Sequence, residues 1–430
     1  MTKATREIPA ENADMARAGL PDGWRWVKLG DVCEVNPPRS RNFKRADDAV
    51  TTFVPMSAVD EARGAIAHAQ TRLFAEVRRG YTFFVEGDVL FAKITPCMQN
   101  GKHAIARGLI GGVGFGTTEF HVLRPKAAVT PEWVHWFLRQ PRVLRIAEAS
   151  FTGTAGQQRV PEQALAEMAV PLPPLAEQKR IAGILEGQMA AVERARAGAA
   201  AQLQAAEQLP AAYLRAVFGS GRTEPPAGWR WVKLGDVLCS LETGSRPPGG
   251  AMGILEGIPS ISAEHMTRHG GFDFSSLRYV PTEFYQQMKR GHIHRGDILV
   301  VKDGATTGKV ALVDECFPYR QAVVNEHVFL CRVAPGIADP RYLFFWLWGT
   351  EGQRAVRSHF QGAAIGGINQ RFAETVEAPL PPLAEQKRIA EILKEQMAAT
   401  EQLRRALAEQ LETINKLPAA LLREAFSGRL

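Results

Sequence analysis

Two long stretches of the chain place apolar residues at alternating spacings of four and three, a pattern typical of coiled-coil helices. The stretch from residue 383 to about 426 carries this seam at Ile389, Leu393, Gln396, Thr400, Leu403, Leu407, Gln410, Ile414, Leu417 and Leu421. The stretch from residue 175 to about 218 carries a weaker one, diluted by Ala and Gly, at Ile181, Leu185, Met189, Val192, Leu203 and Leu209. Both are rich in strong helix formers. We therefore predict two long helices, each kinked or restarted at its internal proline, Pro210 or Pro418.

The blocks between these helices follow a different pattern. They contain short β-branched runs such as GDILVVKDGA, KVALVD and VVNEHVFLCRV, together with helical segments that start near Pro131 and Pro340. This mixture predicts α+β domains that contain a substantial sheet.

The sequence contains an internal repeat, in which the same motifs occur twice in the same order. GWRWVKLGDV occupies residues 23–32 and again residues 228–237, and PLPPLAEQKRIA occupies residues 171–182 and 379–390. Between these identities a skeleton survives, because GDVLFAK pairs with GDILVVK and PEWVHWFL pairs with PRYLFFWL at a nearly constant offset. We infer a tandem duplication in which two domains share a fold while their surfaces diverge.

This repeat predicts a domain plan. We expect an N-terminal extension at 1–22, a first domain at 23–170, a central conserved helix at 171–221, a second domain at 222–378 and a C-terminal conserved helix at 379–430. A pseudo-twofold axis perpendicular to the helices would make them antiparallel, and each would run roughly 50 Å before its proline. The expected result is a rod with one domain at each end. The alternative is two independent helices, each packed on its own domain.

Composition narrows the function only slightly. The 430 residues are 45% hydrophobic and 23% charged, as in ordinary globular proteins, and the net charge of +7 permits a polyanionic partner without proving one. The cysteines are scattered, without the spacing of a zinc site or a disulfide framework. With no apolar leader and no run of about 18 apolar residues, we expect a soluble cytoplasmic protein.

Several fragments resemble enzyme motifs but lack an essential part. Residues 36–39 (NPPR) lack the aromatic residue of the adenine methyltransferase signature and fit a loop that leaves a strand. Residues 304–309 are one residue short of a Walker A spacing and are followed by Val310. Glu177 and Glu385, which mimic part of a nuclease motif, are better explained by the helix dipole. We expect no catalytic role, and no metal or cofactor bound by this chain.

Polar clusters beside glycine turns remain as candidate DNA contacts. Their lysines and arginines can neutralise phosphates and their amides can hydrogen-bond base edges, although a solvated loop is the alternative at each position. Exposed aromatic residues for stacking are not evident, which favours a duplex over a single strand. The candidates in the first block are Lys93, Thr95, Gln99, Asn100, Lys102, His103, Thr152, Thr154, Gln157, Gln158 and Arg159, and those in the second are Lys302, Thr306, Thr307, Lys309, Gln361, Asn369, Gln370 and Arg371.

The order of these motifs resembles one family. GWxxxxLGDV, a variable block with GDILxxK, a glycine-polar segment and PLPPLxEQKRIA, all present twice over residues 23–430, are similar to the specificity subunit of type I restriction-modification enzymes. Residues 1–22 do not match this pattern. The resemblance implies two target recognition domains, each of which reads one part of a bipartite, gapped sequence in double-stranded DNA, with conserved helices that set the gap.

The resemblance also implies partners. The helices would dock two modification subunits, which supply S-adenosylmethionine and adenine methylation, and restriction subunits would supply ATP- and Mg-dependent translocation and cleavage. The alternative from another class is a non-catalytic scaffold or adaptor with two protein-binding heads. Salt-dependent binding of the assembled complex to duplex DNA would separate the two. The target sequence itself is not predicted, because base readout depends on loop geometry and DNA deformability.

Overall fold

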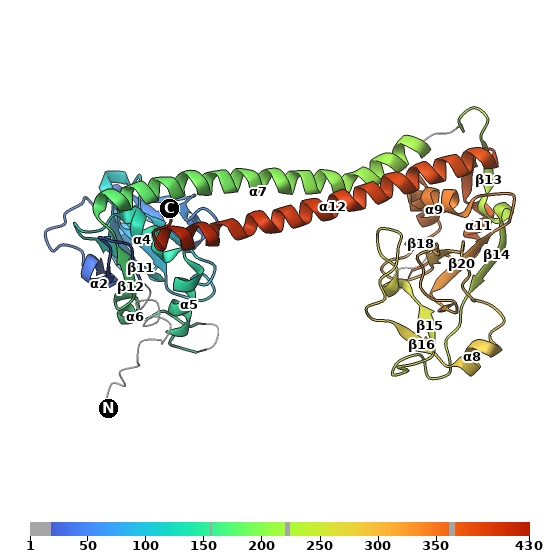
Figure 1. The fold of residues 1–430 in the computed structure, drawn as a ribbon, viewed down its shortest axis with the longest axis horizontal. Coiled ribbons are helices and arrows are strands. Elements are labelled where there is room, and N and C mark those ends of the chain that lie inside the picture. Colours follow the sequence, from blue (N-terminus) through green and yellow to red (C-terminus); the bar gives the residue numbers. More distant parts are fainter. Residues whose placement is uncertain (1–18, 155–156, 220–223, 361–365) are drawn as a thin grey trace. The chain divides into compact units, whose positions relative to one another are not determined.

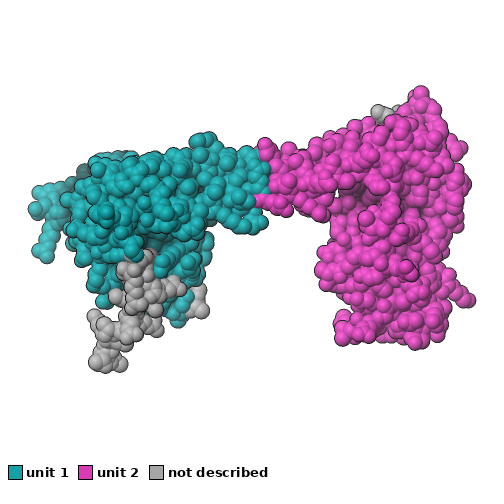
Figure 2. Space-filling view, in the orientation of Figure 1, with its two compact units in different colours: residues 1–199, 410–430 teal, residues 200–409 magenta. Residues whose placement is uncertain are grey.

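A computed structural model describes residues 19–154, 157–219, 224–360 and 366–430 (Figure 1). The chain divides into two compact units, which Figure 2 distinguishes by colour. Unit 1 comprises Met1–Ala199 with Gln410–Leu430, and unit 2 comprises Ala200–Glu409. Each unit contains one α+β domain and a part of both long helices, so the predicted fold class is confirmed.

Unit 1 is built on two four-stranded sheets. The first sheet is antiparallel, with the order β2 (Cys33–Val35), β11 (Phe120–Pro125), β8 (Val89–Ala92) and β9 (His103–Ile105). The second has the order β6 (Gln70–Leu73), β3 (Val50–Val54), β10 (Val113–Gly116) and β7 (Thr82–Val85), and its pair β3 and β10 is parallel. The remaining elements are the short hairpin β4 (Val59–Asp60) and β5 (Ala65–Ile66), and the helices α2 (Leu29–Val32), α3 (Phe74–Val77), α4 (Pro131–Leu138), α5 (Pro141–Ala149) and α6 (Glu162–Ala166).

Unit 2 repeats the first of these sheets in the same order. Its strands are β14 (Leu238–Thr243), β20 (Val328–Val333), β17 (Ile298–Val301) and β18 (Val310–Leu312). Its second sheet has three strands in place of four, β16 (Arg278–Val280), β15 (Ile258–Ile261) and β19 (Val323–Val324). The helices of the domain are α8 (Thr282–Gln287), α9 (Pro340–Trp348), α10 (Thr350–Arg357) and α11 (Phe372–Thr375). The internal duplication is confirmed, and the two copies differ most in the second sheet.

The two repeated sequence motifs meet in space within each unit. Strand β1 (Arg25–Lys28) pairs antiparallel with β12 (Ala169–Leu172), and β13 (Arg230–Lys233) pairs in the same way with β21 (Glu377–Leu380). An aromatic residue of the nearby helix secures each ribbon. The Trp133 indole N–H donates to the Pro171 carbonyl at 2.9 Å, and the Tyr342 hydroxyl donates to the Pro379 carbonyl at 2.6 Å. Segments far apart in sequence thus close each domain.

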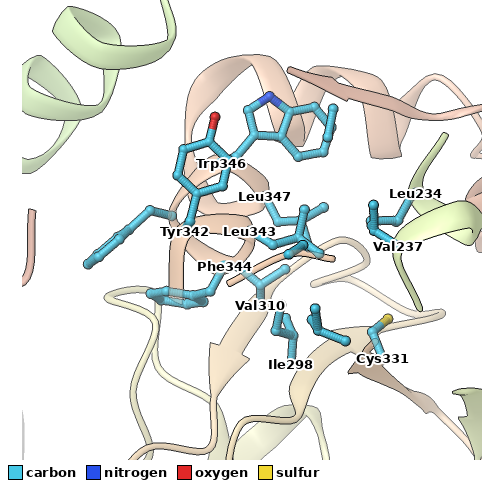
Figure 3. Close-up of a cluster of buried hydrophobic side chains, with 14 of the residues drawn as sticks. Leu234, Val237, Ile298, Val310, Cys331, Tyr342, Leu343, Phe344, Trp346 and Leu347 are labelled. Atoms are coloured by element: carbon cyan, nitrogen blue, oxygen red, sulfur yellow. The ribbon is translucent and has the colours of Figure 1, made fainter. Parts of the chain in front are cut away.

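In unit 2 the main core lies between helix α9 and the four-stranded sheet of that unit. Figure 3 shows Leu343 and Leu347 of α9 converging with Ile298, Val310 and Cys331 from three neighbouring strands of the sheet. All five side chains are buried. The apolar sequence of α9, PRYLFFWLW, is therefore explained by burial against the sheet on one side and against the long helices on the other.

The long helices are α7 (Leu175–Phe218) and α12 (Leu383–Phe426). Each has in its first turn a buried glutamine that hydrogen-bonds to the adjacent domain. The Gln178 side chain accepts a hydrogen bond from the Thr130 N–H at 2.9 Å and donates to the Pro173 carbonyl at 2.9 Å. Gln386 makes the equivalent bonds in unit 2, to the Asp339 N–H and to the Pro381 carbonyl. The repeated EQKR segment is thus the structural start of each helix.

The two helices run antiparallel in each unit. In unit 1, Ile181 near the start of α7 shares a core with Phe426 near the end of α12. In unit 2, Phe218 at the end of α7 shares a core with Ile389 near the start of α12. Among the described residues, no helix is both long enough and apolar enough to span a membrane.

The predicted seam of α12 is half right. Positions seven residues apart, Leu393, Thr400, Leu407 and Ile414, are buried as predicted. The alternate positions Leu403 and Leu417 are wrong, because they are 45% and 40% exposed, whereas Gln396 and Leu421 are partly buried as predicted. Partly buried residues also lie one position after the predicted seam, at Met397, Arg404 and Leu411. Residues three and four positions after a buried residue lie to either side of it on the helix surface. The position of the partner helix decides which of the two is covered.

Of the two outcomes predicted at the internal prolines, a kink or a restart, the restart does not occur. Both helices continue through Pro210 and Pro418 to their ends. An internal proline costs a helix about 3 kcal/mol. Burial of the last turns compensates for this cost, because Leu214 and Phe218 pack in the core of unit 2, and Leu422 and Phe426 pack in the core of unit 1.

Candidate nucleic-acid interface

The two predicted polar clusters of the first block lie together in unit 1. The segment after β8 forms an antiparallel bridge with the segment before α6, between Ile94 and Arg159. The Thr95 N–H donates to the Gln158 carbonyl at 3.0 Å, and the Val160 N–H donates to the Lys93 carbonyl at 2.9 Å. We call the resulting set the first polar surface; it consists of Lys93, Gln99, Asn100, Thr152, Thr154, Gln157, Gln158 and Arg159. Thr95 was also predicted to belong here, but its hydroxyl oxygen is buried.

Unit 2 contains the same arrangement. The segment after β17 bridges the segment before α11, between Asp303 and Gly367, and the Ile368 N–H donates to the Lys302 carbonyl at 2.8 Å. We call this set the second polar surface; it consists of Lys302, Thr306, Asn369, Gln370 and Arg371. Gln361, which was also predicted to belong here, lies outside the described residues. In each unit the fold therefore brings together two polar segments that are separate in the sequence. The sequence related them only through their similar composition.

Two of the lysines predicted to contact DNA donate hydrogen bonds to backbone carbonyls of their own domain. The Lys102 ammonium donates to the Val59 carbonyl at 3.2 Å, and the Lys309 ammonium donates to the carbonyls of Ala263 and Met266 at 3.0 and 2.8 Å. Because these bonds hold each ammonium against backbone oxygens, both lysines act first as clamps between the sheet and the neighbouring loop.

Two further candidates are buried. His103 is buried, and burial lowers the pKa of its imidazole well below the usual value, so the ring is neutral. Thr307 is also buried, and its hydroxyl donates to the Gly304 carbonyl at 2.7 Å. In this structure neither side chain presents a surface to a duplex, in contrast to the prediction from sequence.

A pair of polar side chains lies beside each polar surface, and one member of the pair, Glu119 or His327, occupies the same place in both units. In unit 1, the Arg159 guanidinium donates to both carboxylate oxygens of Glu119, at 2.9 and 2.8 Å. This pairing raises the pKa of Arg159 and lowers the pKa of Glu119. In unit 2, His327 occupies the place of Glu119 and contacts Asp303 at 2.6 Å, from Nδ1 to Oδ1. The two surfaces thus share a backbone frame but differ in the charges that they present.

Sequence reasoning missed a basic cleft beside Lys93. A cleft of about 400 Å³ is lined by Lys93 together with Arg39, Arg78 and Tyr81. The Arg39 guanidinium donates to the Arg78 carbonyl at 3.1 Å, which joins two loops across the cleft. The run of basic residues from Arg39 to Arg45 is the sequence feature that could have indicated it.

Asn36 explains why the NPPR segment is a loop, as predicted. It has a positive φ of 51° directly after β2, and its side-chain oxygen accepts the Val122 N–H at 3.0 Å. The two prolines that follow cannot donate to a sheet, so the strand ends there. In unit 2 the equivalent strand β14 continues to Thr243.

The fold and these surfaces define a class: a tandem-repeat protein whose two diverged polar loop surfaces are carried on copies of one α+β domain. The family model described as type I restriction modification DNA specificity domain matches residues 21–196 and 226–413. The chain belongs to this family.

Named relatives agree with this assignment. The chain is 33% identical over 225 residues to the type I restriction enzyme EcoEI specificity subunit of Escherichia coli, covering 52% of this chain and 37% of the relative. It is 31% identical over 242 residues to the EcoAI specificity subunit of Escherichia coli, covering 56% and 40%. The chain thus spans about two fifths of the length of these curated relatives.

Solved structures match over nearly the whole chain. The HsdS subunit from Thermoanaerobacter tengcongensis matches with a TM-score of 0.67 and 25% identity, covering 96% of this chain and 99% of that one. A chain from a structure on complex assembly and conformational transition of the type I R-M system matches with a TM-score of 0.74 and 25% identity, covering 96% and 100%.

Proposed function

We propose that this chain is the sequence-specific DNA recognition subunit of a type I restriction-modification complex, and that each unit reads one part of a bipartite, gapped target in double-stranded DNA. The main support for this proposal is the pair of duplicated polar loop surfaces. Two copies of one fold present polar loop surfaces at equivalent places, with the same backbone bridge but different side chains. Duplicated surfaces that diverge only in side chains are what two different target sequences require.

The shared and the divergent positions suggest a division of labour. Lys93 and Lys302 occupy the same place after β8 and β17, so a phosphate contact, which carries no sequence information, suits them. Arg159 corresponds to Gly367, and Glu119 corresponds to His327. Positions that differ between the units suit base contacts, where the donor and acceptor pattern must match a particular sequence.

In this proposal the chain performs no chemistry. Two modification subunits supply S-adenosylmethionine binding and adenine methylation, and restriction subunits supply ATP- and Mg-dependent translocation and cleavage. The complex works in the cytoplasm. The scaffold or adaptor alternative is not favoured by the family match.

Mapping of methylated adenines tests the proposal. The chain is assembled with its modification partner, incubated with random-sequence duplex DNA and S-adenosylmethionine, and the methylated sites are sequenced. We expect two specific half-sites separated by unspecified base pairs, and an affinity for duplex that falls steeply with salt. A single contiguous target would contradict the proposal that each unit reads one half-site. Duplex binding that is absent or independent of salt would favour the scaffold alternative.

A further inference from the structure

Unit 2 carries a loop with two unusually exposed apolar side chains. Residues 244–257 connect β14 to β15 (Figure 1) and have the sequence GSRPPGGAMGILEG. Met252 and Leu255 are 88% and 84% exposed, whereas no other large hydrophobic residue in the described part of the chain exceeds 50%. We call residues 244–257 the apolar loop. Exposed apolar surface of this kind is unfavourable in water and points to a partner.

The apolar loop leaves the domain beside the second polar surface. At its start, the Gly244 N–H donates to the Asn325 carbonyl at 3.2 Å, and Arg246 pairs with Glu326 at 3.1 Å. The Glu326 carbonyl in turn accepts a hydrogen bond from the Lys302 ammonium at 3.0 Å. The base of the loop and the second polar surface are therefore one continuous region, with Arg246 and Lys302 on either side of Glu326.

The tip of the loop stands away from the body of the domain. Gly249, Gly250 and Gly253 have φ values of 85°, 85° and 82°, in the left-handed region that favours glycine. A Cβ built at any of these positions would meet nothing within 4 Å. These glycines therefore shape a projecting turn and leave room for a partner around Met252 and Leu255.

Unit 1 has no comparable apolar tip in its described residues. The segment after β2 is basic, with Arg39, Arg41, Lys44 and Arg45, and its phenylalanine is turned inward. Phe43 contacts Phe74 and Phe83, with ring centroids 6.0 and 5.3 Å apart. The apolar loop is thus a property of unit 2, in the part of the fold where the two copies diverge.

We propose that the apolar loop is a wedge that inserts Met252 and Leu255 into the minor groove of the duplex held at the second polar surface; the inference rests on the proposed function. Apolar wedges of Met, Leu or Ile partly unstack one base step and kink the duplex. Arg246 and Lys302 lie at the base of the loop, where phosphates that flank the kinked step would replace their present contacts with Glu326 and Asp303. Flexible pyrimidine–purine steps kink most easily, so the wedge adds sequence preference without a hydrogen bond to a base.

The test uses the chain assembled with its modification partner and a duplex that carries the target mapped by methylation. 2-Aminopurine is placed in turn at each step in and beside the second half-site. The double variant Met252→Ser, Leu255→Ser is compared with wild type and with Ile337→Ser. Ile337 is a matched control, because it is 45% exposed and lies in the turn beyond the C-terminal end of β20, whereas Glu326 precedes that strand.

We expect wild type and Ile337→Ser to raise 2-aminopurine emission at one step. The double variant is expected to lose that rise and to bind the target about tenfold more weakly. Equal emission and equal affinity in the double variant would overturn the wedge while leaving the proposed function intact. A double variant that no longer assembles with the modification partner would make the loop a protein contact and would also overturn the wedge. If the wild-type complex binds no duplex, the proposed function fails together with the wedge.

Discussion

The carboxylate of Asp88 accepts two hydrogen bonds from the guanidinium of Arg124, at 2.9 and 2.8 Å, although Asp88 is only 1% exposed. Asp297 and Arg332 repeat this pair in unit 2. The hydrogen bonds that Arg124 donates to Asp88 raise the pKa of Arg124. The pair joins the turn before β8 to β11, and it explains why the repeated segments GDVLFAK and GDILVVK both carry an aspartate.

Asp88→Ala is expected to destabilise unit 1 by about 3–5 kcal/mol, because it leaves a partly buried guanidinium without its partner. Native-state hydrogen exchange of the β8 and β11 amides measures this loss. Asp47→Ala is the control, since it removes the exposed Arg78–Asp47 pair and is expected to cost less than about 1 kcal/mol. Equal losses in both variants would contradict a structural role for the buried pair.

Gln178→Ala is expected to loosen the junction between α7 and the first domain. The substitution leaves the Thr130 N–H and the Pro173 carbonyl without their bonds to this side chain, at a cost of about 1–3 kcal/mol. Hydrogen exchange in the first turns of α7 should accelerate accordingly. Lys179→Ala changes an exposed neighbour and should leave exchange unchanged.

His135→Phe is expected to make unit 1 less sensitive to acid. Burial, followed by the charges of Arg139 and Arg107, lowers the pKa of His135 to about 3. Below its ordinary pKa of about 6.5 the unfolded chain binds a proton that the folded chain does not, so stability falls as the pH drops from 6.5 towards 3. By linkage, His135 costs about 2 kcal/mol at pH 5.

Phenylalanine is the natural replacement, because α9 carries Phe344 at the place that His135 has in α4. Urea unfolding at pH 7 and pH 5 measures the effect. The variant should lose less stability between the two values than wild type does, and His68→Gln, at an exposed position, should behave as wild type. An unchanged difference would show that His135 is protonated in the folded chain.

Lys93→Ala and Gln370→Ala should affect DNA binding in different ways. Loss of a phosphate contact at Lys93 should weaken binding to all sequences and reduce the salt slope by about one. Loss of a base contact at Gln370 should cost about 1–3 kcal/mol and relax selectivity only in the half-site read by unit 2. Competition binding against single-base variants of the target measures both, with Gln402→Ala on the exposed face of α12 as the control.

Exchange of residues 33–170 for the corresponding block of another family member should change one half-site only, whereas added helix residues should change the gap. Methylation mapping of the hybrid complex checks this expectation. If the exchange altered both half-sites, the two units would not read DNA independently.

The sequence was sufficient for the duplication, the α+β class and the long helices, because each rests on local or repeated patterns. Identical motifs in the two halves require identical environments, and the structure pairs them as β1 with β12 and as β13 with β21. The burial of every seventh residue, at Leu393, Thr400 and Leu407, likewise follows from the geometry of one helix packed against another. Candidate surfaces were found by composition alone, as polar residues beside glycine turns.

Only the tertiary structure decided which polar side chains are free to contact a ligand. Lys102 and Lys309 look in sequence like surface cations, yet both donate to backbone carbonyls of a loop more than 40 residues away. The choice between Leu403 and Arg404 as the covered side of α12 was also non-local, since it depends on where α7 lies. Periodicity and composition report what a residue could do, whereas its partners across the fold determine what it does.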